Sequence, residues 1–217
     1  MGSNPAVIAF RFSGCLALAL ACLTPAQAQD RMPPIPMSEM TDAQRTVAAT
    51  VEAERGYSLR GPWVPLLRSP EMLDLMVDVR DHVRDRSLLS FKLTEFAILM
   101  AAREWTQHYV WNAHYPAAIR AGLDAQIITA IADGRRPDRM SNEEEILYDL
   151  SMELHRNKHV SDETYARALG VFGQDGIIEA VAIDGYYSLL ARVMNTARTP
   201  LRQDVPPPPV TLPTFPR

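Results

Sequence analysis

The stretch FKLTEFAILMAAREWTQHYVWNAHYPAAIR, residues 91–120, decides the fold. Its first part is strongly apolar and reads as a buried helix. Bulky and β-branched polar residues follow at Arg103–Thr106, and we predict a turn there that folds one helix back on the next. In one straight helix Glu95 and His114, 19 residues apart, would be separated by about 28 Å along the axis. The predicted turn instead brings Glu95 near His114.

Pro116 adds a second irregularity to this stretch. It has no N–H for the carbonyl of Asn112, and it disfavours helical geometry at Tyr115. The helix therefore either kinks here or a new helix begins. In both cases a free carbonyl lies beside His114, where it would fix the tautomer of the ring.

The rest of the chain also has helical periodicity, and no stretch alternates convincingly enough to be a strand. Thr41 with Gln44 and Ser141 with Glu144 have the capping-box spacing. The predicted helices span residues 42–54, 70–84, 91–102, 106–121, 125–132, 142–157, 162–172 and 176–197. The predicted fold is all-α, a single-domain bundle of seven or eight helices over residues 29–202. In helix 70–84 we expect a buried face formed by Met72, Met76, Val79 and Val83.

Residues 1–28 resemble a secretory signal peptide. The apolar run Cys15–Leu23 follows Arg11, and Ala26-Gln27-Ala28 offers a cleavage site. The alternative is a lipoprotein, cleaved before Cys22. We expect a periplasmic or secreted protein, and no stable membrane insertion because a nine-residue run is too short to span a bilayer.

Residues 203–217 form a proline-rich tail, with four consecutive prolines at 206–209. Such a tail favours polyproline II geometry and cannot hold a helix. It is either a disordered terminus or an arm that lies across a neighbouring subunit.

Charge and cysteine content exclude several function classes. The net charge is −4, and it becomes −5 without residues 1–28, so nucleic acid and anionic membranes are not expected partners. Both cysteines, Cys15 and Cys22, lie in the predicted signal peptide. The exported chain would have no thiol, which excludes disulfides, thiolate metal sites and cysteine nucleophiles.

Several motifs together resemble the carboxymuconolactone decarboxylase family of the alkyl hydroperoxidase D-like superfamily. The resemblance extends over about residues 31–202. The matching segments are Pro33-Pro34, Met40–Arg45, Gly61-Pro62, Leu66–Pro70, Lys92–Glu95, Ile98-Leu99, Tyr109–His114, Pro116-Ala117, Ala121–Leu123 and Gly185–Tyr187. The resemblance implies an all-α fold, assembly as a homotrimer or homohexamer, and acid–base chemistry without cofactor or metal.

The resemblance also implies the site. The family pattern has a Glu at the head of one helix, matched by Glu95, and Tyr-Glu-Trp-x-x-His on the next, matched by Tyr109, Trp111 and His114. The two acid–base groups, Glu95 and His114, are then the catalytic pair. Val110 stands where the motif has its own Glu, which puts direct transfer of the family's substrate in doubt.

The same alignment argues against thiol peroxidase activity. The hydroperoxidase branch has cysteines seven and four residues before the histidine, where this chain has Gln107 and Val110. Without sulfur there is no attack on a peroxide or a disulfide.

Other residues are candidates on their own chemistry. Glu95 lies in an apolar helix, where a carboxylate needs a partner such as Lys92 or Arg103. We also expect its pKa to be raised by the apolar surroundings. The candidates for substrate binding are Glu104, Gln107, His108, Tyr109, Trp111 and Tyr187.

Two of these sets have a competing interpretation. Glu104 and His108 share a helix face, either as a second acid–base pair or as an exposed ion pair. His155 and His159 have the i, i+4 spacing of a metal-binding pair. Arg156 and Lys158 lie between them, however, and the four residues are better explained as cationic side chains at a helix C-terminus, where positive charge complements the helix dipole. No metal site is predicted.

The leading hypothesis is a lyase or isomerase that moves a proton next to a carbonyl of a small carboxylated lactone or cyclic acid. Export argues against the literal decarboxylase, whose pathway is expected in the cytoplasm. The alternative is a periplasmic small-ligand-binding oligomer that has lost catalysis. A peroxidase is the third and least favoured hypothesis.

Overall fold

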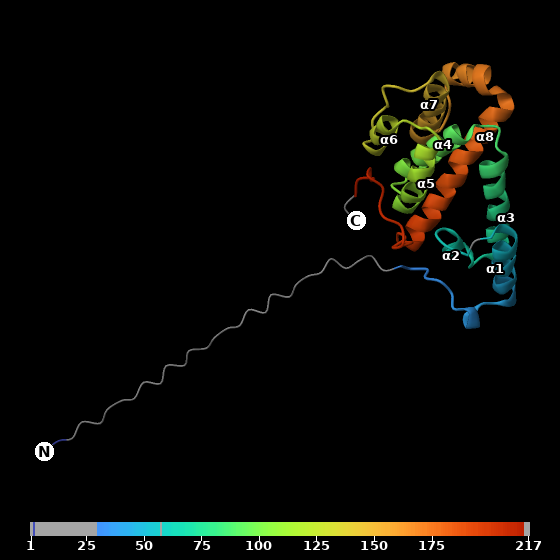
Figure 1. Cartoon of the computed structure of the whole chain (residues 1–217), viewed down its shortest axis with the longest axis vertical. Helices are drawn as coiled ribbons and strands as arrows, with labels where there is room; N and C mark the ends of the chain where they lie inside the picture. Colours follow the sequence, from blue (N-terminus) through green and yellow to red (C-terminus); the bar gives the residue numbers. More distant parts are fainter. Residues whose placement is uncertain (1, 3–29, 57, 215–217) are drawn as a thin grey trace.

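The computed structural model describes residue 2, residues 30–56 and residues 58–214. Apart from residue 2, the predicted signal peptide and its alternative lipid-bearing Cys22 lie outside this range. In the described part of the chain all regular structure is helical (Figure 1), which confirms the predicted all-α class. No helix there is long and apolar enough to cross a membrane.

The helices agree closely with the predicted ranges. They are α1 (Asp42–Arg55), α2 (Trp63–Leu66), α3 (Pro70–Asp81), α4 (Phe91–Glu104), α5 (His108–Arg120), α6 (Ala125–Ala132), α7 (Asn142–Asn157) and α8 (Asp162–Ala197), with a 3-10 turn, η1 (Met37–Glu39), and a π-helix, η2 (His82–Arg86). Both predicted capping boxes are present. The short α2 was missed. A break at Gly173, with φ 65° and ψ 177°, divides α8 near the predicted gap.

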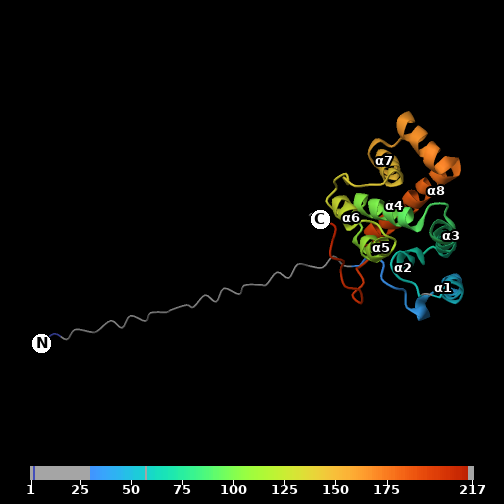
Figure 2. The ribbon, with the colours of Figure 1, turned by 45° about the horizontal axis from the view of Figure 1, so that its top comes forward.

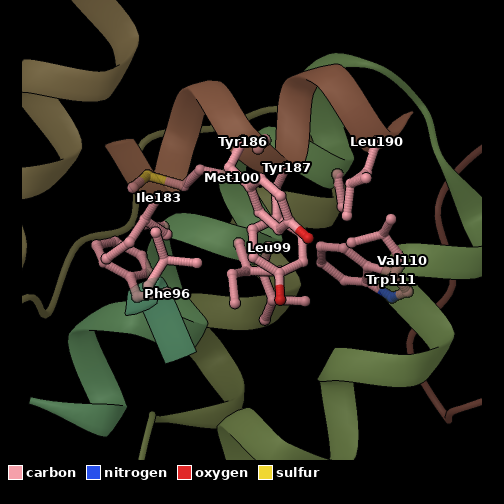
Figure 3. Close-up of a cluster of buried hydrophobic side chains, with 14 of the residues drawn as sticks. Phe96, Leu99, Met100, Val110, Trp111, Ile183, Tyr186, Tyr187 and Leu190 are labelled. Carbon is pink, nitrogen blue, oxygen red and sulfur yellow. The ribbon is translucent and has the colours of Figure 1, made fainter. Parts of the chain in front are cut away.

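Helix α4 is the centre of the molecule. All residues from Leu93 to Ala102 are buried, and the helix contacts α5, α6, α7 and α8. Helices α1, α2 and α3 lie together on one side of the molecule, and α6 and α7 on the other (Figures 1 and 2). Figure 3 shows side chains of α4, α5 and α8 meeting in one cluster around Leu99 and Trp111. An apolar run without a polar face is what a helix covered on all sides requires.

The predicted turn between α4 and α5 is confirmed. Thr106 has φ 46°, its N–H bonds to Arg103 O, and the N–H of Gln107 bonds to Ala102 O. This is a Schellman motif, which ends a helix in the left-handed conformation normally given to glycine. Pro116 lies within α5, so the chain continues as a helix past it.

The expected buried face of helix 70–84 is confirmed at Val83, which is 1% exposed, and wrong at Met72 and Val79. Leu73 and Val77 are buried, whereas Met72 is 43% exposed and Val79 is 36% exposed. The buried stripe continues at the same three- and four-residue spacing to Arg80 and Arg84, whose charges hid it in the sequence.

The proline-rich tail packs against its own chain as far as it is described. The indole N–H of Trp111 donates to Val210 O at 2.8 Å, and Leu212 is 3% exposed. Figure 1 shows this segment, in red, beside α5. Residues 203–214 therefore lie against their own domain, and the arm across a neighbouring subunit stays a prediction.

Candidate active site

The turn between α4 and α5 brings the predicted pair together. Glu95 on α4 is fully buried, and its Oε2 lies 2.8 Å from Nδ1 of His114 on α5. The carboxylate lies behind the imidazole and does not line a cavity, whereas His114 does. Of the two side chains, only His114 is in a position to contact a molecule in the cavity.

Arg84 completes the cluster from the π-helix η2. Its Nη1 lies 2.8 Å from Glu95 Oε1, 2.9 Å from His114 Nδ1 and 3.5 Å from the Tyr187 hydroxyl. The contact with Oε1 is an ion pair, and Oε1 has no other polar partner among the described residues. π-Helical turns recur at functional sites because they shift side chains out of the normal register.

The sequence expectation for the partner of Glu95 was wrong. Lys92 instead pairs with Glu144 at 2.9 Å, and Arg103 donates from Nε to Ala132 O at 2.8 Å. The expected rise in the pKa of Glu95 is wrong as well. Burial raises this pKa, but the His114 hydrogen bond and the charges of His114 and Arg84 outweigh burial and lower it. Glu95 is thus an anion at neutral pH.

An ionised Glu95 determines the tautomer of His114. Two contacts compete at Nδ1, because Glu95 Oε2 at 2.8 Å only accepts and Arg84 Nη1 at 2.9 Å only donates. Arg84 also has Glu95 Oε1 and the Tyr187 hydroxyl as partners. The proton is therefore assigned to Nδ1, where it satisfies Oε2 of the buried carboxylate. Burial lowers the pKa of His114 below 6.5, although Glu95 acts in the opposite direction. The ring is therefore neutral at pH 7, with a free lone pair on Nε2, which has no partner among the described residues. This is the protonation state of a general base.

Tyr187 of α8 lies across the imidazole. The two rings meet edge to face with centroids 5.0 Å apart. Burial raises the pKa of Tyr187 to about 12, against the effect of Arg84. The hydroxyl therefore stays protonated, and its proton has no acceptor among the described residues. It is a free donor beside the base.

These groups open onto a cavity of about 380 Å³ that holds more positive charge than the composition suggests. That volume suits a small molecule. The cavity is lined by His114, Tyr187, Tyr109, Val110, Asn112, Trp63, Leu190, Met194 and five arginines, Arg60, Arg80, Arg84, Arg120 and Arg202, together with smaller apolar residues. No Asp or Glu side chain lines it. Three of these arginines already pair with carboxylates outside the lining: Arg80 with Asp81 and Asp85, Arg84 with Glu95, and Arg202 with Asp204. Arg60 and Arg120 have no ion-pair partner among the described residues, and their charges favour an anionic ligand.

The other predicted site residues divide into two groups. Tyr109 and Tyr187 line the cavity, whereas Trp111, Gln107, Glu104 and His108 do not. Trp111 is fully buried, and Gln107 caps α5 and bonds to Asn195 at 2.9 Å. His155 bonds to Asp184 at 2.9 Å and not to His159.

The sequence reasoning missed the arginines and Asn112. The positions of Arg80 and Arg84 could have been predicted, because these residues continue the apolar stripe of α3. Arginine ordinarily faces solvent, so an arginine on a buried stripe indicates a functional site. Arg120 lies six residues after His114 on the same helix. Nothing local marks Arg60 or Arg202, which reach the cavity from loops.

The same fold occurs in solved structures of low sequence identity. A protein described as an alkylhydroperoxidase AhpD core, an uncharacterized peroxidase-related protein from Ralstonia eutropha JMP134, matches with a TM-score of 0.65 at 14% identity over 80% of this chain and 93% of its own. The fold is that of the AhpD core. A peroxidase-related protein from Silicibacter sp. TM1040 matches with a TM-score of 0.65 at 13% identity over 86% of this chain and 97% of its own.

A third neighbour is an enzyme by its name. The debrominase Bmp8, in a variant bound to 2,3,4-tribromopyrrole, has a TM-score of 0.62 at 12% identity over 82% of this chain and 94% of its own. No protein-family model and no curated protein matches the sequence. At these identities the likeness establishes the fold alone.

Proposed function

We propose that this protein is an acid–base enzyme of the lyase or isomerase type, acting without a cofactor on a small carboxylated lactone or cyclic acid. The observation that carries the proposal is the Glu95–His114 pair at the floor of a cavity lined by five arginines. A neutral imidazole supplies a base, and the arginines supply affinity for an anion.

The geometry supports a proton transfer in two steps. His114 Nε2 removes a proton from the carbon next to a carbonyl, and Glu95 stabilises the imidazolium that forms. The negative charge that develops on the carbonyl oxygen is stabilised by the Tyr187 hydroxyl and the Arg84 guanidinium. The imidazolium then returns the proton to the same or another carbon. If carbon dioxide leaves instead of a proton, the neutral imidazole has no proton on Nε2 to give, and the resulting enolate takes its proton from water.

Peroxidase chemistry of the thiol type has no support in the site. Val110 lines the cavity where the hydroperoxidase branch would have a cysteine, and residues 30–217 contain no cysteine. We also propose export through the N-terminal signal and a homo-oligomeric state, which the apolar exposed side chains of α3 and α8 favour.

The proposal is tested without knowing the natural substrate. Carboxylated lactones and cyclic keto acids are incubated with the protein in D₂O, and loss of the C–H signal next to the carbonyl is followed by NMR. The wild type should exchange deuterium into at least one of them, and His114→Ala and Glu95→Gln should each slow exchange by about a hundredfold or more.

A control and a competing outcome complete this experiment. His159→Ala removes a histidine that is exposed and far along the chain from the site, and it should leave exchange unchanged. If the panel binds and shifts the melting temperature but no variant changes exchange or product, the protein is a ligand-binding oligomer and not an enzyme.

A further inference from the structure

The C-terminal segment spans the mouth of the cavity. This strap, residues 199–212, begins where α8 ends, with the N–H of Thr199 on Met194 O at 3.0 Å. It is held at its far end by the bond from Trp111 to Val210 and by buried Leu212. Between these anchors Leu201, Arg202 and Val205 line the cavity, so the strap is part of its wall.

Arg202 of the strap is held by a near neighbour. Its Nε lies 3.0 Å from Oδ1 of Asp204, and its Nη2 also contacts that carboxylate. The side chains of Arg202 and Asp204 are 34% and 68% exposed, so the pair is solvated and weak. A ligand carboxylate could therefore displace Asp204 from Arg202 at a small cost in free energy.

Arg60 lines the same cavity, and its charge acts on the carboxylate of Asp204. It lines the cavity and has no ion-pair partner among the described residues. The Arg202 hydrogen bond is the main cause, and the Arg60 charge a weaker one, of the lowered pKa of Asp204. Asp204 therefore lies within the electrostatic reach of both arginines.

The ring of Tyr109 supports this arrangement from below. A Cβ on Gly61 would come within 2.6 Å of Tyr109 Cε1, so a glycine next to Arg60 lets the loop lie on the ring. Gly61 has φ 57°, which a side chain would also disfavour. The loop that carries Arg60 therefore packs against Tyr109 of α5.

We propose that Arg60 and Arg202 form a second anion subsite at the mouth of the cavity, and that Asp204 occupies it until a ligand carboxylate displaces it. The ligand class is a small dicarboxylate, with one charged group near Arg84 and Tyr187 and the other at the mouth. The inference rests on the anionic ligand of the proposed function and does not depend on its chemistry.

Calorimetric binding to the purified protein tests the subsite. The probes are unbranched dicarboxylates of three to eight carbons, each paired with the monocarboxylate of equal carbon number. At least one dicarboxylate should bind about tenfold more tightly than its monocarboxylate, because the second group gains a charge-assisted hydrogen bond.

The variants distinguish a binding role from a structural one, because they are expected to change the dicarboxylate affinity in opposite directions. Arg202→Gln and Arg60→Gln should each weaken the dicarboxylate about fivefold or more and leave the monocarboxylate within about twofold. Asp204→Asn should tighten the dicarboxylate, because the internal competitor loses its charge. Arg202→Lys should restore part of the loss. Arg135→Gln breaks a similar exposed pair, with Asp133, that does not line this cavity and should change neither affinity.

Three results would overturn the subsite. They are no dicarboxylate binding to the wild type, equal affinity for the paired acids, or a loss of affinity in Asp204→Asn. The proposed function fails separately, because it would be contradicted by deuterium exchange that survives in His114→Ala whatever the binding constants are.

Discussion

At the scale of single residues the site depends on one buried carboxylate. Glu95 is ionised because Arg84 and His114 supply the interactions that burial removes. The ionised carboxylate places the proton of His114 on Nδ1, against the Arg84 contact at that nitrogen, and leaves Nε2 free. The proposed activity and the stability of the fold would then depend on the same ion pair, and two separate measurements test them.

The activity should depend on pH through His114. Because burial lowers the pKa of its imidazole below 6.5, kcat/KM should rise with pH with an apparent pKa below that value. It should then stay level through the neutral range, since the pKa of Tyr187 is about 12. A pH–rate profile of deuterium exchange checks this. A midpoint above 7 would mean that another group is the base.

Arg84→Met should destabilise the protein by about 3–5 kcal/mol at pH 7, because it leaves the buried Glu95 charge without its cation. In the wild type the lowered pKa of Glu95 contributes stability above about pH 4.5 that is lost as the pH falls through the folded-state pKa. In the variant burial favours the neutral acid. The difference between the two proteins should therefore shrink on acidification, as urea unfolding at several pH values would show.

The matched control for this variant is Arg135→Met. Its ion pair with Asp133 is exposed on both sides, so the loss should be within about 0.5 kcal/mol at any of these pH values. An Arg84 variant as stable as this control would show that the Glu95 charge does not need Arg84.

At the scale of elements, the turn between α4 and α5 places the pair. Gln107 accepts a hydrogen bond from the N–H of Tyr109 at 2.8 Å, and it donates to Asn195 of α8 at 2.9 Å. One side chain thus caps α5 and joins it to α8. The register of His114 relative to Glu95 depends on this connection.

Gln107→Ala should cost about 1–2 kcal/mol of unfolding free energy, because it removes a helix cap and the hydrogen bond to Asn195. It should also slow exchange without changing the apparent pKa, since His114 keeps its partners. Gln126→Ala, at an exposed position in α6, serves as the control for both measurements. Full activity in a destabilised Gln107 variant would separate the cap from the site.

The sequence predicted the elements better than the cavity. The turn at Arg103–Thr106 follows from a change in composition, and Glu95 with His114 follows from the family resemblance. Arg84 could not be paired with Glu95 from the sequence, because their contact depends on a π-helical turn between α3 and α4. Local sequence patterns predict which face of a helix is buried, but they do not predict which loop packs against that face.

At the scale of the molecule, the tail is part of the domain. Leu212 is buried and Trp111 has its indole partner in the tail, so residues 199–212 add to the core that surrounds α5. Packing of the tail against its own chain was not predicted, because its contacts are distant in the sequence, as in the hydrogen bond from Trp111 to Val210 with a separation of 99 residues.

Leu212→Ala should cost about 2 kcal/mol or more, because it removes buried apolar contacts from the far anchor of the strap. Leu88→Ala, at a position that is 68% exposed, should change stability by no more than about 0.5 kcal/mol. Thermal unfolding of the two variants compares them directly. Equal melting temperatures would mean that the tail does not contribute to the folded core.

The central claim is that His114 is neutral at pH 7, with its proton on Nδ1 and a free Nε2 facing the cavity. Nitrogen-15 NMR of the histidine rings measures this directly, with the His114 signals assigned by their loss in His114→Gln. The account predicts one protonated nitrogen, Nδ1, at pH 7, and an imidazolium only below pH 6.5. A proton on Nε2, or a doubly protonated ring at pH 7, would contradict it.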